Sequence, residues 1–341
     1  MSKIKNVLPW TMAVAIFAYL FHLYPPQKIW ESLQFVRLST FIPFAIGYFF
    51  LIFFADTFAL TRLLKRFGFA IHVKDLVAAR GVTYLLMILN YAAGQAAFAY
   101  YLKRTHRIPL WEAFSLFFFI AFIDLYWVIT LAFAGSFFLN FNIAGIELKK
   151  FVWIVAAIAY IIFILNLLFW RGPLYKKIES KNWRAIHWIR KKDIFRLLKE
   201  AKISDYLKLA FLRIPIHISL IVSMYIVLKT FDVFVPFIQL LGNIPLVILT
   251  GTIPITPGGL GTTNAVMVEL LKPYLKGPIF DRGVITPAEL LFTASLLWMF
   301  ANYFLKALFG MICLKKVSKD LFQPPLKSHS PPTSLGQNLP I

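Results

Sequence analysis

Long apolar runs separated by short basic loops dominate this sequence. A helix needs roughly twenty apolar residues to cross a bilayer. Runs that approach or exceed this length occur at 8–24, 40–60, 111–135, 151–170, 209–231 and 288–314. Two further apolar segments, 76–102 and 233–275, are interrupted by polar residues, proline or glycine. The pattern predicts about six transmembrane helices and two broken segments.

The second interruption is the more pronounced of the two. Residues 251–264 read Gly-Thr-Ile-Pro-Ile-Thr-Pro-Gly-Gly-Leu-Gly-Thr-Thr-Asn. Proline lacks an amide donor and glycine leaves the backbone unrestrained, so a helix cannot continue through this run. In a bilayer, the freed backbone groups must be satisfied by protein or by a water-filled cavity. We therefore expect the tip of a re-entrant helical hairpin that lines a polar site.

Basic residues indicate how these segments are oriented. Segment 171–208 holds twelve Lys and Arg against four Asp and Glu, and it would lie outside the cell if every apolar run crossed once from a cytoplasmic N-terminus. Cytoplasmic loops normally carry the excess of positive charge. Because 61–75 and 103–107 are both basic, we expect 75–104 to enter and leave on the cytoplasmic side. The hairpin 233–275 then enters from outside, and both termini are cytoplasmic.

The predicted fold class is an all-α polytopic membrane protein, with about six transmembrane helices and two re-entrant helical hairpins in an inverted-repeat arrangement. Residues 1–135 form the first membrane half, and 136–316 form the second. The tail 317–341 is rich in proline and serine near its end, and we expect it to be disordered in the cytoplasm. Inverted repeats with broken helices are typical of secondary transporters, which bind substrate where the repeats meet.

Composition and charge support a cytoplasmic-membrane protein. The chain is 60% hydrophobic and only 15% charged, whereas soluble domains contain about a quarter charged residues. The net charge is +21, and the basic residues that produce it lie between the apolar runs. We therefore expect anionic lipid headgroups of the inner leaflet as partners rather than nucleic acid. The basic loop 171–208 fits either an amphipathic helix on that leaflet or a solvated linker.

Signatures of enzymes and metal sites are absent from the sequence. It has no His-Glu-x-x-His, no nucleophile elbow and no Gly-x-Gly-x-x-Gly motif, and its six histidines are scattered. We therefore predict no catalytic activity, no metal and no cofactor.

Charged residues at membrane depth are costly and are candidates for function. Asp56, Asp124, Glu269 and Lys306 are predicted to pair charges or couple transport to protons. Arg80 and Arg213 lie near the cytoplasmic ends of their segments, where they either bind substrate or extend toward the membrane surface. Asp124 in particular has no charged neighbour in its run, so it needs a partner or water.

Residues at the two interruptions complete the candidate substrate site. Thr262 or Thr263 is predicted to cap the helix that runs to Leu271, whose N-terminus would attract a phosphate. Alternatively, the polar residues only cap broken helices and the Pro-Gly run only forms a buried turn. The predicted substrate-binding residues are Arg80, Asn90, Gln95, Arg213, Thr256, Gly258, Gly259, Gly261, Thr262, Thr263 and Asn264.

The run Pro254-Ile-Thr-Pro-Gly-Gly-Leu-Gly-Thr262, followed by an apolar helix, resembles the C-terminal motif of the lysylphosphatidylglycerol synthase transmembrane family. Leu212-Arg-Ile-Pro215, and Arg80, Asn90 and Gly94 in the first broken segment, fit the same resemblance over about residues 8–316. These membrane proteins are flippase-like. In full-length members a soluble aminoacyl-transferase domain follows, and here we expect the membrane domain alone.

The resemblance implies that the protein moves a phospholipid or polyprenyl-linked headgroup between leaflets. Two alternatives stay open. The protein is a non-transporting membrane partner of a cytoplasmic glycosyltransferase or lipid-modifying enzyme, docked through 171–208. Less favoured is a membrane enzyme that modifies lipids with Asp56 or Asp124, since a lone carboxylate has no paired acid nearby.

Overall fold

Helices make up nearly all of the structure, a computed structural model that describes residues 2–138, 142–143, 146–171, 192–252, 256 and 259–322. The α-helices are α1 (Ser2–Leu23), α2 (Pro26–Leu33), α3 (Leu38–Arg66), α4 (Val73–Leu89), α5 (Tyr91–His106), α6 (Leu110–Ser136), α7 (Leu148–Arg171), α10 (Arg196–Glu200), α11 (Ile203–Lys229), α12 (Phe237–Thr252), α13 (Thr262–Leu271) and α14 (Pro287–Phe322). Short 3-10 helices cover Asp193–Phe195, Lys272–Tyr274 and Pro278–Arg282, and strands β1 (Asn142–Ile143) and β2 (Ile146–Glu147) pair antiparallel.

Within the described part of the chain, five helices are long and apolar enough to cross a membrane: α3, α6, α7, α11 and α14. They correspond to five of the six predicted spans. The apolar part of α1, Trp10–Leu23, is shorter than a full span, as is α12. The all-helical, multi-pass architecture is therefore confirmed, whereas the count of six and the re-entrant path of the broken segments stay predictions.

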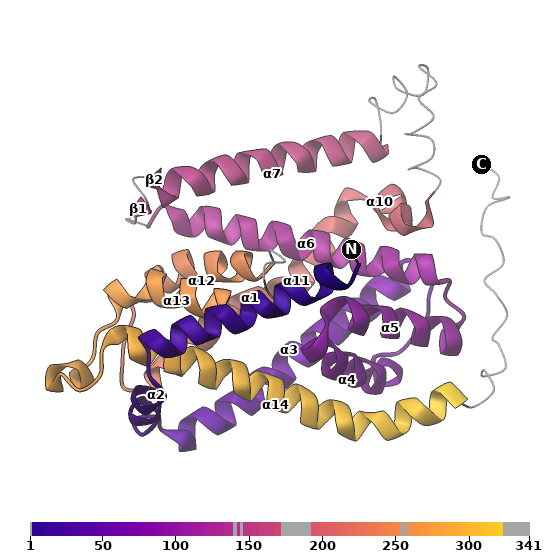
Figure 1. Ribbon diagram of the computed structural model, residues 1–341. Helices are drawn as coiled ribbons and strands as arrows, with labels where there is room; N and C mark the ends of the chain where they lie inside the picture. The colour runs from indigo at the N-terminus through magenta and orange to yellow at the C-terminus, as the bar shows by residue number, and fades with distance from the viewer. Residues whose placement is uncertain are drawn as a thin grey trace, which may run out of the picture.

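Both interrupted segments form pairs of helices that pack on each other. In the first hairpin, α4 packs on α5 and the break falls at Asn90. In the second hairpin, α12 packs on α13 across the glycine-containing run. Figure 1 shows α4 and α5 at one end of the long axis, and α12 and α13 at the other.

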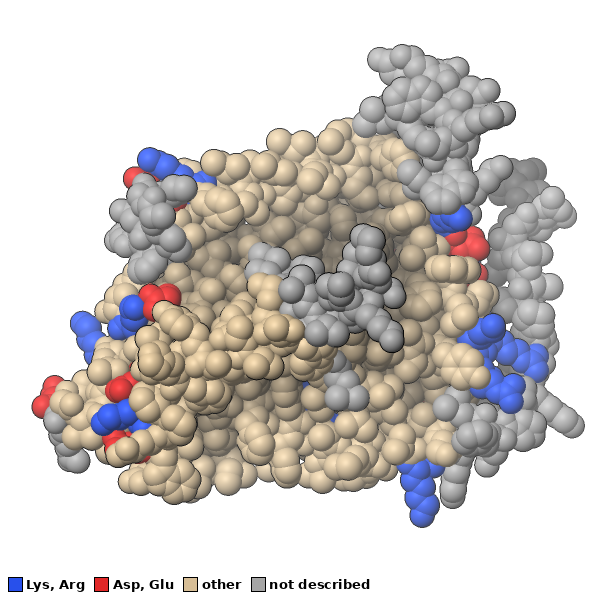
Figure 2. Space-filling view, in the orientation of Figure 1, with Lys and Arg blue, Asp and Glu red and all other residues tan. Residues whose placement is uncertain are grey.

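Charged side chains gather at the two ends of the visible face, and a broad band without them lies between (Figure 2). The long helices run along the same axis (Figure 1). A bilayer excludes unpaired charge from its apolar layer, so this band is the part of the surface suited to contact lipid tails.

The hairpins exchange partners between the two predicted halves. Helix α4 of the first hairpin packs on α14, the last helix of the second half. Reciprocally, α12 of the second hairpin packs on α6, the last long helix of the first half, and α3 packs on α11. Two halves related by a two-fold axis produce this reciprocal packing. It favours the division into 1–135 and 136–316, which stays a prediction.

Glycines allow the closest of these contacts. A Cβ added to Gly135 of α6 would lie 2.3 Å from the Cα of Gly242 in α12. One added to Gly310 of α14 would lie 2.8 Å from the carbonyl oxygen of Gly81 in α4. Small residues let membrane helices approach closely enough for their backbones to pack. The α6–α12 contact and the α4–α14 contact therefore both depend on glycines that face each other.

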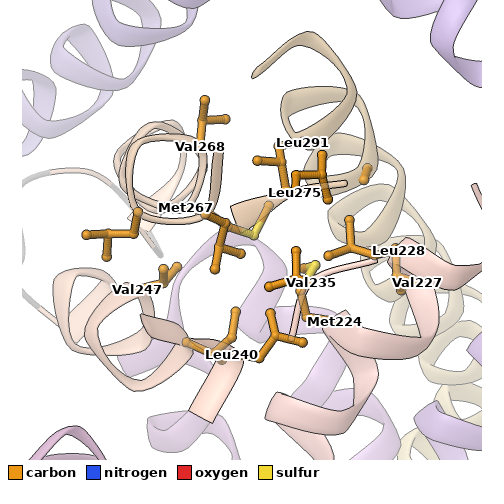
Figure 3. Close-up of a cluster of buried hydrophobic side chains, with 14 of the residues drawn as sticks. Met224, Val227, Leu228, Val235, Leu240, Val247, Met267, Val268, Leu275 and Leu291 are labelled. Atoms are coloured by element: carbon orange, nitrogen blue, oxygen red, sulfur yellow. The ribbon is translucent and has the colours of Figure 1, made fainter. Parts of the chain in front are cut away.

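Two hydrophobic clusters surround the hairpins. Figure 3 shows side chains of one cluster, which joins the second hairpin to α11 and α14 through residues such as Met224, Leu240, Met267 and Leu291. The other joins the first hairpin to α3, α6 and α10 through residues such as Leu64, Leu76, Leu102 and Leu197.

The described end of the basic segment 171–208 packs inward. Leu197 and Leu198 of α10 are buried, and the Leu197 amide donates a hydrogen bond to Ser115 Oγ at 2.9 Å. These apolar side chains therefore contact α6 instead of a lipid leaflet, which corrects the amphipathic-helix interpretation for them. Residues 172–191 lie outside the described part of the chain, and so does the predicted docking of a partner there.

The predicted disordered tail begins too early. Helix α14 continues to Phe322, so the expectation is wrong for residues 317–322. The physical reason is that Leu314–Phe322 contains neither proline nor glycine, and the first helix-breaking residue is Pro324. The described residues end before Pro324.

We predict that Gly135→Leu lowers the thermal stability of the detergent-solubilised protein. Added side-chain atoms in a packed interface typically cost about 1–3 kcal/mol, and here they meet backbone that cannot move aside alone. Gly47→Leu on α3 is the matched control, since a Cβ there meets no atom within 4 Å. Equal melting temperatures for the two variants would contradict the close contact between α6 and α12.

Candidate functional site

The centre of the candidate site is the carboxylate of Asp56 on α3, whose residue is only 7% exposed. Arg80 of α4 donates a hydrogen bond through Nη2 to Oδ2 of this carboxylate. Arg213 of α11 donates through Nη1 to Oδ1 at 2.5 Å, and the Tyr84 hydroxyl donates to Oδ2 at 3.1 Å. One buried carboxylate thus joins three helices.

Arg213 extends this arrangement to Asp124 on α6. Its Nε lies 2.7 Å from Asp124 Oδ1 and its Nη2 lies 2.5 Å from Oδ2, a two-point contact. His217, one turn further along α11, places Nε2 at 3.0 Å from Asp124 Oδ1, and its ring stacks on Trp127. The partner that the sequence required for Asp124 is therefore Arg213.

We call Asp56, Arg80, Asp124, Arg213 and His217 the charged cluster. Its two carboxylates balance its two guanidinium groups when His217 is neutral. Charges buried away from water are tolerated when they are paired and hydrogen-bonded, and this pairing fixes α3, α4, α6 and α11 relative to one another. Arg80 and Arg213 are buried and paired with carboxylates, so the alternative in which they merely extend to the membrane surface is wrong.

His217 and Tyr84 were not among the residues predicted for the site. Each follows an arginine by four residues, His217 after Arg213 and Tyr84 after Arg80. Residues four apart share one face of a helix, so this spacing was an available signal.

Arg80 keeps hydrogen-bonding capacity that the protein does not use. The residue is 5% exposed, yet its Nε and Nη1 atoms are buried without a partner among the described residues. Its guanidinium carbon lies 5.4 Å from the Tyr84 ring centroid and 5.0 Å from that of Phe98. A buried donor without an acceptor is costly, so these N–H groups are suited to bind an anionic oxygen.

The tip of the first hairpin carries polar side chains of its own. Asn90 Oδ1 accepts a hydrogen bond from the Ala93 amide at 3.0 Å, so this side chain caps α5. Gln95 Nε2 donates to the Tyr91 hydroxyl at 2.9 Å, while Gln95 Oε1 is buried without a partner in the described structure. Asn90 thus has a structural role, and Gln95 retains a free acceptor.

The second hairpin uses its polar side chains to hold its own turn. Helix α13 begins at Thr262 with Gly261 as its N-cap, so the prediction that Thr262 or Thr263 is the cap is wrong. Both threonine hydroxyls instead donate to the Gly259 carbonyl, at 3.0 and 2.9 Å. Thr256 Oγ1 lies 3.2 Å from Thr262 Oγ1. The hydroxyls of Thr262 and Thr263 thus satisfy the Gly259 carbonyl, one of the backbone groups at the break.

Asn264 of α13 ties the same turn to α14. Its Oδ1 accepts from the Gly261 amide at 3.3 Å, and its Nδ2 donates to Ser295 Oγ at 2.8 Å. The residue is 4% exposed. Asn264 therefore positions the second hairpin, and both ends of its amide are occupied.

The backbone conformation and close packing of this turn explain why glycine occupies its described positions. Gly259 and Gly261 adopt φ values of +74° and +80°, which side chains disfavour. A Cβ at Gly259 would lie 2.9 Å from the Cα of Gly251, and one at Gly261 would lie 2.9 Å from Cγ2 of Ile16. Gly258 lies outside the described residues. Substituting these glycines would disturb the turn whether or not a ligand binds there.

A cavity of about 180 Å³ lies between this hairpin and helices α11 and α14. Thr263, Asn264 and Tyr303 are among its lining residues. Lys306, half-buried one turn beyond Tyr303, places Nζ 5.7 Å from the Tyr303 ring centroid and 5.8 Å from that of Tyr84. Because Tyr84 bonds Asp56, Lys306 lies between the cavity and the charged cluster.

Glu269 is not brought to this site. It forms an ion pair with Lys272 at 2.7 Å, and both side chains are exposed near the end of α13. An exposed pair of this kind contributes little to stability. The structure places Asp56 and Asp124 together and Lys306 near them, and it leaves Glu269 apart.

Comparison with known proteins identifies the family. A family model described as the lysylphosphatidylglycerol synthase TM region matches residues 6–310. The chain therefore belongs to this family, and it is a multi-pass membrane protein of a family connected with lipid handling. No curated protein and no solved structure matches the chain.

We predict that Asp56→Asn strongly destabilises the protein, because it leaves Arg80 and Arg213 facing each other without the shared carboxylate. Breaking a buried ion pair from one side typically costs about 3–5 kcal/mol. Tyr84→Phe removes one hydrogen bond to the same carboxylate and should cost about 0.5–1.5 kcal/mol. Denaturant unfolding in detergent measures both. Equal stability of the two variants would show that Asp56 does not organise the cluster.

Proposed function

We propose that this member of the lysylphosphatidylglycerol synthase transmembrane family moves lipid headgroups between the leaflets of the cytoplasmic membrane. The headgroup phosphate binds at Arg80, where the first hairpin packs Arg80 of α4 against Phe98 of α5. The observation that carries the proposal is the pair of buried, unused donor atoms on Arg80. Family membership supplies the connection with lipids.

The chemistry of Arg80 suits a phosphate. A guanidinium is always charged and forms strong, charge-assisted hydrogen bonds with phosphate oxygens. The rings of Tyr84 and Phe98 flank this guanidinium between α4 and α5. Its two unused N–H groups therefore favour an anionic group at this place.

Because Asp56 pairs with both Arg80 and Arg213, a headgroup phosphate can replace it at Arg80. When a phosphate oxygen approaches Arg80, it competes with Asp56 for that guanidinium. Asp56 then keeps its bond with Arg213, so no carboxylate is left unpaired. The charged cluster thereby exchanges one anion for another at depth, while the acyl or polyprenyl chains stay in the bilayer.

The second hairpin serves the opposite leaflet in this proposal. It lies at the other end of the molecule (Figure 1), and Lys306 lies between its cavity and the charged cluster. A headgroup that leaves Arg80 meets this cation next. In this proposal the basic end, which carries the last turns of α3 and α5, faces the cytoplasm, because loops rich in positive charge stay inside.

We predict that purified protein in liposomes exchanges labelled phospholipids or polyprenyl phosphates between leaflets faster than empty liposomes do. Arg80→Gln should slow this exchange at least tenfold, since it removes a charge-assisted contact that is typically about 1.5–3 kcal/mol. Lys103→Gln, an exposed cation on α5, is the matched control. Quenching with an impermeant reagent follows the exchange.

A folded protein that exchanges no lipid of the panel would contradict the translocation proposal. The partner-subunit function, with a cytoplasmic lipid- or glycan-modifying enzyme docked through the basic loop 171–208, would then be favoured. Equal exchange by Arg80→Gln and wild-type protein would instead remove Arg80 from the headgroup site.

A further inference from the structure

An apolar groove of about 650 Å³ lies between α3 and α11, outside the charged cluster. Phe58 and Leu63 of α3 and Leu207 and Phe211 of α11 line it. Leu207 is 65% exposed and Phe211 is 72% exposed. Both helices are long enough to span the membrane, so the groove opens toward lipid.

Basic side chains lie at one end of this groove, and two of them have no acidic partner. Arg66, the third, is neutralised by Asp205, with Nε–Oδ1 and Nη2–Oδ2 distances of 2.7 and 3.0 Å. Asp205 also accepts the Lys202 amide at 2.8 Å. Arg62 and Lys208 form no ion pair with any other residue of the described chain.

Arg62 is oriented along the groove wall. Its guanidinium carbon lies 4.8 Å from the ring centroid of Phe58. A cation over an aromatic face keeps its charge while its stem covers apolar surface. Arg62 on α3 and Lys208 on α11 thus place two positive charges over an apolar groove, from opposite walls.

We infer that this groove binds an anionic phospholipid, with one acyl chain along Phe58, Leu63 and Phe211 and the phosphate between Arg62 and Lys208. The volume lies in the range of about 300–1,000 Å³ that is usual for ligand sites. The apolar lining matches a hydrocarbon chain, and the two unpaired cations match the phosphate. Basic pockets between membrane helices bind such headgroups.

The position in the helices agrees with a lipid in one leaflet. Arg66 ends α3 and Ile203 begins α11, so the basic residues lie within two turns of the helix ends, where headgroups reside. The same two helices carry Asp56 and Arg213 further inward. The groove therefore holds a lipid beside the charged cluster, and this binding does not depend on the proposed translocation.

Native mass spectrometry of the purified protein with phosphatidylglycerol and phosphatidylcholine tests the inference. Wild-type protein should bind phosphatidylglycerol more tightly. The double variant Arg62→Gln, Lys208→Gln should bind it about 30-fold more weakly, because each cation near an anionic headgroup contributes about fivefold in affinity. Its binding of phosphatidylcholine should change little.

The matched control is Lys103→Gln, Arg104→Gln, which removes the same charge from exposed positions in the last turn of α5. An equal loss in this control, or equal wild-type binding of the two lipids, would overturn the groove site. Displacement of the lipid by soluble glycerol phosphate would overturn it too, because it would indicate a site for free phosphate.

The two proposals fail separately. If the Arg80→Gln variant loses leaflet exchange but binds phosphatidylglycerol as wild-type protein does, Arg80 acts in translocation and the groove is a separate site. Unchanged phosphatidylglycerol binding in the Arg62 and Lys208 variant overturns the groove site, whatever the protein does in liposomes.

Discussion

The structure depends on one shared carboxylate. Asp56 receives hydrogen bonds from arginines on two other helices. One of them, Arg213, also donates hydrogen bonds to Asp124. In an apolar environment, a charge that leaves this cluster either becomes unpaired itself or leaves a partner unpaired, and both are costly. The arrangement therefore fixes the long helices around the first hairpin and, because Asp56 can exchange one arginine for a ligand's anion, also gives that region its proposed chemistry.

The apolar runs were enough to predict five of the spanning helices, and the breaks at Asn90 and at 251–264 were correctly read as places where helices end. The sequence alone could not predict which acidic and basic side chains form ion pairs. Asp56 and Arg213 are 157 positions apart, and no local pattern relates them. Arg80 and Arg213 lie near the starts of their apolar runs, 76–102 and 209–231, where an arginine reaching the surface and one paired at depth look alike in the sequence.

The glycine-containing run 251–264 shows a second limit. A turn that satisfies its own backbone and a loop that receives a ligand need the same residues: glycines with positive φ, threonines and an asparagine. In the structure, Thr262, Thr263 and Asn264 bond within the turn or to Ser295. Among the residues predicted to bind substrate, those with buried atoms that lack a partner in the described structure are instead Arg80 and Gln95 of the first hairpin. No sequence pattern distinguishes these two from the other candidates.

Charge balance narrows the headgroup that this site suits. Asp56 and Asp124 are both engaged by Arg213, and Asp56 by Arg80 as well. Lys306, nearby, forms no ion pair with any described residue and adds one positive charge. A cationic group entering here would find both carboxylates occupied, whereas a phosphate finds free N–H groups on Arg80. The proposed site therefore selects a lipid by its phosphate, and an amine on the same headgroup must be held elsewhere or remain in water.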